Sequence, residues 1–277
     1  MQRILRVFRN SVFIRGMSNM SVKYEEKLAS INGSCINYLK AGNGENTVFC
    51  LPGALGTIWS DFKPQVEFLC NHMTVVAWDP PGYGKSRPPP RDFSGHFFER
   101  DADAGACLME HLGIKKFSIL GWSDGGITGL IIAGKYAERV DKTIVWGANA
   151  YVTDADINLY EGIRDTSKWS EKMRAPLEAA YGKENLSKMM SDWVEAMIRY
   201  RNSEGGDICK THLPMITSKT LIVHGDKDPL VPSEHPKYLM ETISKAAYHN
   251  FPDGKHNLHL RYSQEFNTLV RDFICDN

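Results

Sequence analysis

The sequence predicts an α/β fold in which a mostly parallel sheet of eight strands is flanked by helices and interrupted by a helical insertion. Short apolar runs alternate with segments of helical periodicity, as in proteins whose parallel strands are joined by helices. A glycine-rich turn, residues 121–126, joins one such run directly to a helical segment. Between residues 150 and 213 the strand pattern stops. A chain of 277 residues is long enough for one such domain with an insertion.

Composition and charge argue against several function classes. The formal net charge is zero and no long basic run follows the N-terminal segment, so nucleic-acid binding is not expected. No apolar run approaches the roughly 20 residues of a membrane span. The six cysteines are scattered without a Cys-x-x-Cys pair, which fits a reduced compartment and argues against a zinc site or disulfide framework. We expect a small-molecule substrate and no metal or organic cofactor.

The first 20 residues differ from the rest of the chain. They contain no acidic residue and four arginines, and their apolar side chains can share one helical face. An arginine-rich, acid-free amphipathic start is typical of a mitochondrial transit peptide. We therefore predict that residues 1–20 direct the protein to mitochondria; the alternative is a disordered basic tail.

Eight runs are predicted to form the sheet, and the first two surround a hairpin turn at Asn32-Gly33. The predicted strands cover residues 22–28, 36–39, 47–51, 74–78, 117–120, 143–146, 220–224 and 247–251. Helices are predicted over residues 97–112 and 262–274. We therefore expect a core of residues 21–149 and 214–277. Residues 150–213 would form a helical cap over the active site, packed mainly by its own aromatic side chains.

The turn after the fifth strand has the pattern Gly-x-Ser-x-Gly, which between a strand and a helix forms a nucleophile elbow. The turn is so sharp that only small residues fit two positions before and after the nucleophile, and Gly121 and Gly125 occupy them. If Asp124 were the nucleophile, Trp122 would take one of these positions. Ser123 is therefore the expected nucleophile.

The acid and base follow the last two strands. Asp228 precedes a proline and is the better candidate for the acid, whereas Asp226 is expected to be a solvated loop residue. His256 precedes the closing helix. The order serine, aspartate, histidine is that of α/β-hydrolases, in which histidine takes the serine proton and aspartate orients the histidine.

The expected oxyanion hole has two backbone donors. The residue after the nucleophile supplies one N–H group in this fold, and the loop after the third strand supplies the other. These donors fall on Asp124 and on Ala54, with Leu55 as the alternative to Ala54.

The side chain of Asp124 is electrostatically unusual, because a carboxylate beside an oxyanion hole opposes the charge that develops there. An ammonium group next to the scissile carbonyl would resolve the conflict, and an α-amino acid ester carries one. The alternative is that Asp124 complements the helix dipole or pairs with an internal lysine or arginine.

Four segments closely resemble the valacyclovir hydrolase family, also called biphenyl hydrolase-like proteins. These segments are residues 121–126, 146–154, 221–232 and 254–259. The resemblance runs from about Val22 to the C-terminus. It implies a serine hydrolase of α-amino acid esters, with its triad on Ser123, Asp228 and His256 and its amino-group site on Asp124. It also implies a mitochondrial location where such an N-terminus is present. Pro52-Gly53 departs from the His-Gly pair common in the fold, which leaves the first oxyanion donor open.

Three other functions compete with this interpretation. A general carboxylesterase would use the same triad with a structural Asp124. A ring-cleavage carbon–carbon bond hydrolase shares the fold and triad, but Asp124 would repel its anionic substrates. A non-catalytic ligand-binding member of the fold usually lacks part of the triad. We expect a monomer.

Overall fold

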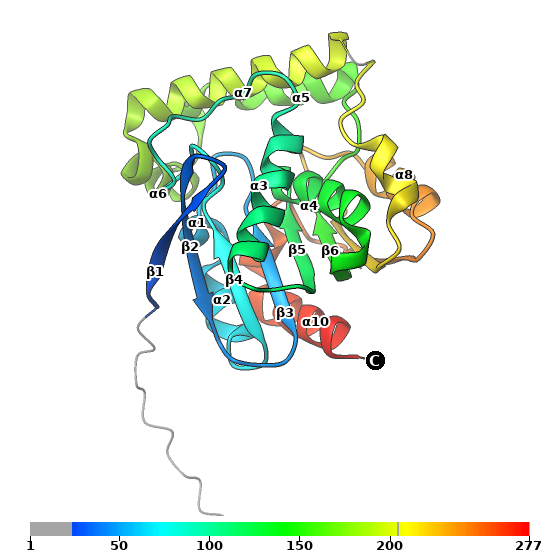
Figure 1. The fold of residues 1–277 in the computed structure, drawn as a ribbon. Helices are drawn as coiled ribbons and strands as arrows, with labels where there is room; N and C mark the ends of the chain where they lie inside the picture. Colours follow the sequence, from blue (N-terminus) through cyan, green and yellow to red (C-terminus); the bar gives the residue numbers. More distant parts are fainter. Residues whose placement is uncertain (1–23, 204, 277) are drawn as a thin grey trace, which may run out of the picture.

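A single sheet of eight strands forms the framework of the computed structural model, which describes residues 24–203 and 205–276 (Figure 1). The strands are β1 (Glu26–Ile31), β2 (Ser34–Ala41), β3 (Thr47–Leu51), β4 (Thr74–Trp78), β5 (Phe117–Trp122), β6 (Val140–Trp146), β7 (Lys219–Gly225) and β8 (Ala246–Phe251). Their order across the sheet is β1-β2-β4-β3-β5-β6-β7-β8. The β1–β2 and β2–β4 pairs are antiparallel and the others are parallel. The predicted mostly parallel sheet is confirmed.

The N-terminal hairpin turns where the sequence predicts. Asn32 and Gly33 have φ values of 50° and 80°, the left-handed pair that fits the twist of a tight hairpin. Strand β1 begins at Glu26 rather than at Val22, which lies outside the described residues. The predicted transit peptide, residues 1–20, also lies outside them.

Helices cover both faces of the sheet. One face carries α1 (Ile58–Asp61), α2 (Lys63–Leu69) and α10 (Ser263–Cys275), with the short α9 (Leu258–Arg261) before α10. The other carries α3 (Phe97–His111), α4 (Asp124–Lys135) and α8 (Glu234–Thr242). Alternate residues of β3 serve the two cores: Phe49 and Leu51 face one, Val48 and Cys50 the other. None of the helices in the described ranges has the length and apolar composition to cross a membrane.

The insertion between β6 and β7 is helical. It contains α5 (Asp154–Ile163), α6 (Glu171–Tyr181) and α7 (Lys183–Ser203), which lie together at one end of the molecule (Figure 1). We call these the cap helices. Short 3₁₀ segments are η1 (Ala137–Arg139), η2 (Thr166–Lys168) and η3 (Lys210–Met215), and η3 packs against core helix α4. The domain boundaries at residues 150 and 213 stay a prediction.

Candidate active site

The turn around Ser123 has the steep geometry that the sequence predicts. Ser123 follows β5 and precedes α4, with φ 53° and ψ −121°. Such a conformation costs a non-glycine residue about 1–3 kcal/mol and persists only where the surroundings impose it. A Cβ atom on Gly121 would lie 2.5 Å from the Gly125 carbonyl oxygen, and one on Gly125 would lie 2.0 Å from the Leu51 carbonyl oxygen. Both positions therefore require glycine.

Ser123, His256 and Asp228 form one chain of hydrogen bonds. His256 Nε2 lies 3.1 Å from Ser123 Oγ, and His256 Nδ1 lies 2.9 Å from Asp228 Oδ2. The three residues follow β5, β8 and β7, whose carboxyl ends meet at one edge of the parallel sheet. These distances let His256 accept the serine proton directly.

The surroundings of Asp228 keep it ionised. Its Oδ1 accepts hydrogen bonds from the N–H groups of Leu230 and Val231, at 2.8 and 3.1 Å. Burial alone would raise the pKa of Asp228, but the charge and hydrogen bond of His256 and the two backbone amides hold it below its ordinary value. Asp226 is exposed and accepts a hydrogen bond from Asn250 instead. Only Asp228 of the two candidate acids reaches His256.

Two residues position His256, a role that the sequence did not predict for either. Trp122 Nε1 donates to the His256 carbonyl oxygen at 2.9 Å, which ties the histidine loop to the elbow. Gly147, at φ 58°, lies beneath the imidazole, because a Cβ there would be 2.8 Å from His256 Cε1. No local pattern marks either residue, since each acts on a loop distant in the chain.

The loop after β3 lies against the nucleophile. A Cβ on Gly53 would be 3.3 Å from the Ser123 Cβ. The buried carboxylate of Asp61 accepts the Gly53 N–H at 2.9 Å and so fixes the start of this loop. The N–H groups of Ala54 and Asp124 have no acceptor among residues 24–203 and 205–276, as an oxyanion hole requires. The choice between Ala54 and Leu55 stays a prediction.

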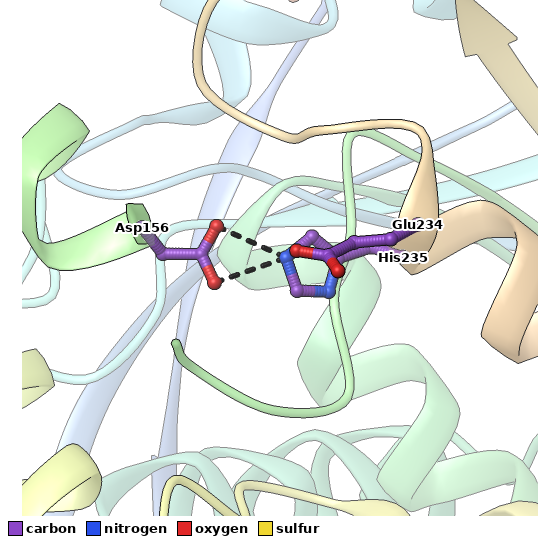
Figure 2. Close-up of side chains that lie close together, drawn as sticks. All are labelled: Asp156, Glu234 and His235. Carbon is purple, nitrogen blue, oxygen red and sulfur yellow. Dashed lines mark hydrogen bonds and ion pairs between the residues drawn. The ribbon is translucent and has the colours of Figure 1, made fainter. Parts of the chain in front are cut away.

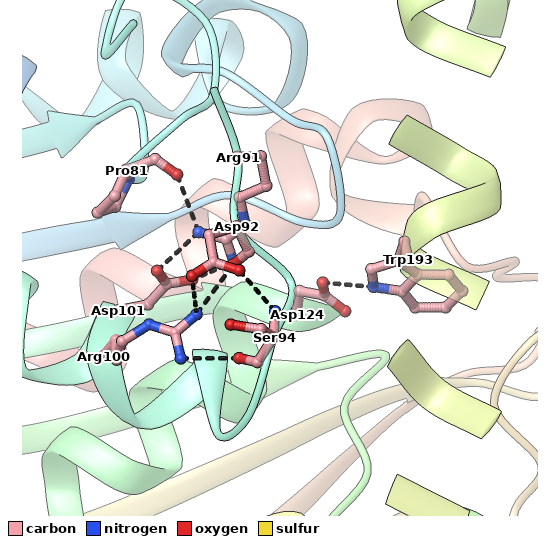
Figure 3. A network of polar contacts seen from close by, with 8 residues as sticks. All are labelled: Pro81, Arg91, Asp92, Ser94, Arg100, Asp101, Asp124 and Trp193. Atoms are coloured by element: carbon pink, nitrogen blue, oxygen red, sulfur yellow. Dashed lines mark hydrogen bonds and ion pairs between the residues drawn. The ribbon is translucent and has the colours of Figure 1, made fainter. Parts of the chain in front are cut away.

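Asp124 is buried, with 7% of its surface exposed, and its partner comes from the cap (Figure 3). Trp193 Nε1 donates to Asp124 Oδ2 at 2.8 Å. No lysine, arginine or histidine in the described part of the chain forms an ion pair with Asp124. Arg91 is held instead by Asp101, at 2.7 and 2.6 Å. Burial raises the pKa of Asp124 to about 7, although the Trp193 hydrogen bond and the Arg91 charge oppose this.

A second polar cluster joins a cap helix to the core (Figure 2). His235 Nε2, on α8, lies 3.0 Å from both carboxylate oxygens of Asp156, on α5. Glu234 is adjacent, and within the described ranges this is the one group of three whose ligand atoms lie close enough to hold a metal ion. Asp156 also accepts hydrogen bonds from Thr153 at the start of α5. The buried Asp156–His235 pair therefore serves as a contact between cap and core.

The aromatics of the insertion pack on the core as well as within the cap, and two of them contact the active-site loops. Tyr151 packs against Tyr238 of α8, and Tyr200 packs against Phe97 and Phe98 of α3. The predicted packing set is Tyr151, Tyr160, Trp169, Tyr181, Trp193 and Tyr200. Tyr181 Oη donates to the Leu55 carbonyl oxygen at 2.9 Å. Trp193 reaches Asp124, which the sequence analysis missed because Trp193 looks like any apolar residue on the buried face of α7.

Comparison with known proteins shows which family the chain belongs to. Residues 46–195 match the alpha/beta hydrolase fold family. The chain is 51% identical over 246 residues to the serine hydrolase BPHL of Mus musculus, covering 88% of this chain and 84% of that protein. The Homo sapiens BPHL is 50% identical over the same length. The chain belongs to the BPHL family of serine hydrolases. The resemblance to this family, the fold and the serine hydrolase class are thereby confirmed.

Other proteins similar to this BPHL-family hydrolase carry different names. A 2-hydroxy-6-oxononadienedioate/2-hydroxy-6-oxononatrienedioate hydrolase of a Pseudomonas species is 29% identical, covering 88% of this chain and 93% of that protein. A meta-cleavage product hydrolase from Pseudomonas fluorescens superposes with a TM-score of 0.74 at 23% identity, covering 89% and 96% of the two chains. An enol-lactonase from Burkholderia xenovorans superposes with a TM-score of 0.73 at 19% sequence identity, covering 90% of this chain and 100% of that chain. These two structures show the shared fold.

Proposed function

We propose that this serine hydrolase cleaves α-amino acid esters through an acyl-enzyme on Ser123. His256 takes the Ser123 proton as Oγ attacks the acyl carbon, and returns it to the departing alcohol. Asp228 holds the imidazole and stabilises its cation. The tetrahedral oxyanion accepts hydrogen bonds from the Asp124 N–H and from the N–H of Ala54 or Leu55. A water molecule, deprotonated by His256, then releases the amino acid and restores Ser123.

The observation that carries the proposal is the buried carboxylate of Asp124 beside the nucleophile. It accepts a neutral indole N–H, while Arg91 is neutralised by Asp101. A buried carboxylate without a cationic partner is costly, so its retention next to the reacting serine suggests a ligand that brings the charge. The ammonium of an α-amino acid ester lies one carbon from the acyl carbon. A charge-assisted hydrogen bond to it is worth about 1.5–3 kcal/mol.

Replacing Asp124 with asparagine should abolish the preference for amino esters. We expect kcat/KM for a valine ester to fall by about 30-fold, and kcat/KM for its des-amino analogue to change little. Asparagine keeps the size of the side chain and an oxygen for the Trp193 N–H. Because burial raises the pKa of Asp124 to about 7, the ionised side chain destabilises the fold at pH 8. The variant should therefore keep or raise its melting temperature there.

Asp192→Asn is the matched control, since Asp192 is a half-exposed residue next to Trp193 that pairs with Lys188. It should leave both esters unaffected. If wild-type enzyme treats the two esters alike, the ammonium assignment is wrong and the protein is a general carboxylesterase. Binding of esters without any turnover would support a ligand-binding role instead.

A carbon–carbon bond hydrolase is the second candidate, favoured by the 29% identity to a protein named as a hydrolase of 2-hydroxy-6-oxononadienedioate and 2-hydroxy-6-oxononatrienedioate. Its substrates would be dienoate acids. Asp124 is poorly placed for them, because its charge would repel an anionic substrate beside Ser123. Turnover of a dienoate acid together with no turnover of a cationic ester would establish this alternative.

We also propose that the protein acts as a monomer in mitochondria. All three triad residues come from one chain, and the first 20 residues carry arginines without acids. Fused to a fluorescent protein, residues 1–20 should direct it to mitochondria. Replacing the four arginines with glutamate should leave the fusion elsewhere in the cell. Mitochondrial staining that survives this replacement, or a wild-type fusion found elsewhere, would contradict the proposal.

A further inference from the structure

The carboxylate of Asp124 is held from the cap, by a residue 69 positions along the chain. Trp193 lies on α7 and is 5% exposed. Its ring packs edge-on against Tyr160 of α5, with centroids 4.9 Å apart. The indole is therefore fixed between two cap helices with its N–H directed at Asp124 Oδ2 (Figure 3).

We propose that Trp193 is a positioning residue that orients Asp124 toward the ammonium of the substrate. The inference rests on the proposed function. Asp124 Oδ2 is occupied by the Trp193 N–H, while Oδ1 accepts no hydrogen bond from any residue that the structure describes. Fixing one oxygen determines where the other points. Because the carboxylate is already oriented, binding of the ammonium does not carry the entropic cost of fixing a freely rotating side chain.

The electrostatic surroundings make this single donor important. Burial raises the pKa of Asp124, and Asp101 adds to the effect, while Trp193, Arg91 and His256 lower the pKa. The neutral hydroxyls of Tyr83 and Tyr160 also lie near Asp124.

Arg91 forms no ion pair with Asp124: Asp101 holds it in a bidentate pair, and the Pro81 carbonyl oxygen accepts a hydrogen bond from it as well. A carboxylate that accepts a hydrogen bond is stabilised in its ionised form. Without Trp193, Asp124 should be protonated over a wider pH range. An uncharged acid binds an ammonium weakly.

Trp193→Phe tests the inference, with Trp169→Phe as the matched control. Trp169 also lies in the insertion, but its Nε1 donates to the Ile163 carbonyl oxygen. In Trp193→Phe, the preference for a valine ester over its des-amino analogue should fall about tenfold. The pH midpoint for kcat/KM of the valine ester, expected near 7 in wild type, should move to higher pH. The control should keep both the preference and the midpoint.

A double variant separates this role from packing. In an Asp124→Asn background, Trp193→Phe should cause no further loss of preference, because the group it positions is gone. Equal losses for both esters without a shift in the pH midpoint would show that Trp193 only packs the cap. An unchanged preference and midpoint would also overturn the inference while leaving the proposed function intact. If Asp124→Asn itself leaves the preference unchanged, the proposed function fails first.

A spectroscopic measurement on the wild-type chain does not depend on how Trp193→Phe folds. The protein has six tryptophans, and ¹⁵N-labelled tryptophan makes each indole N–H visible by NMR. The chemical shift of the Trp193 indole N–H should change with pH as Asp124 ionises, with a midpoint of about pH 7. That titration should disappear in Asp124→Asn. Its persistence there, or its absence from wild type, would mean that Trp193 does not act on the ionised carboxylate.

Discussion

Ser123→Ala should lower kcat by about a million-fold, the loss typical when a triad nucleophile is removed. The side chain of Ser123 is positioned to attack: its Oγ lies 3.1 Å from His256 Nε2, at the start of a helix and beside the Asp124 N–H. Alanine removes the reacting atom and leaves the elbow glycines and the oxyanion donors in place. The variant should bind substrate and remain folded. Steady-state kinetics and the melting temperature measure these two effects.

Covalent labelling identifies the nucleophile directly. An alkyl fluorophosphonate should add to wild-type enzyme at the peptide containing Ser123 and should not add to Ser123→Ala. Ser118→Ala is the control, since Ser118 is a buried serine on the same strand, β5. It should label and turn over like wild type. Substantial ester turnover by Ser123→Ala would contradict the assignment of Ser123 and favour Asp124 as the nucleophile.

Asp228→Asn should lower kcat by about ten-thousand-fold, whereas Asp226→Asn should change it by less than about twofold. In the first variant the amide NH₂ group faces His256 Nδ1, because the other side-chain atom accepts the Leu230 and Val231 amides. An NH₂ group cannot accept the Nδ1 proton, so the imidazole takes the tautomer that cannot receive the Ser123 proton. Asp226 is exposed and pairs only with Asn250.

The pH profile of the residual activity distinguishes a tautomer effect from a folding defect. A wrong tautomer should lower kcat across the whole pH range while the melting temperature stays near that of wild type. If Asp226→Asn shows the large loss and Asp228→Asn does not, the assignment of the acid is reversed. If neither does, His256 is oriented by another group.

The elbow and the sheet could be predicted because they depend on short stretches of chain. Gly121 and Gly125 are required by contacts with residues of the same turn and the neighbouring strand. The apolar runs that form the central strands β3 to β7 are largely buried, so their positions can be predicted from the sequence within a few residues. The hairpin at Asn32-Gly33 follows from the φ values that this pair tolerates.

The order of the triad could also be predicted, since each member follows its own strand and parallel strands bring their carboxyl ends together. Sequence alone ranked Asp228 above Asp226, but the two lie in one loop and only the direction of each side chain separates them. One points to His256 and the other to solvent. That direction depends on the backbone amides of Leu230 and Val231, which the fold places around Asp228.

By itself, the sequence determined the fold class, and it predicted the nucleophile and the unusual acid that follows it. The tertiary structure decided that this acid lies buried without an ion pair to any described residue, since Arg91 is engaged by Asp101, and that its hydrogen-bond partner is Trp193. Neither fact could be predicted from the spacing of residues along the sequence. Each depends on side chains from distant segments meeting across the interface between cap and core. Hydrogen bonds and ion pairs act over a few ångströms of space, and only the folded chain sets those distances.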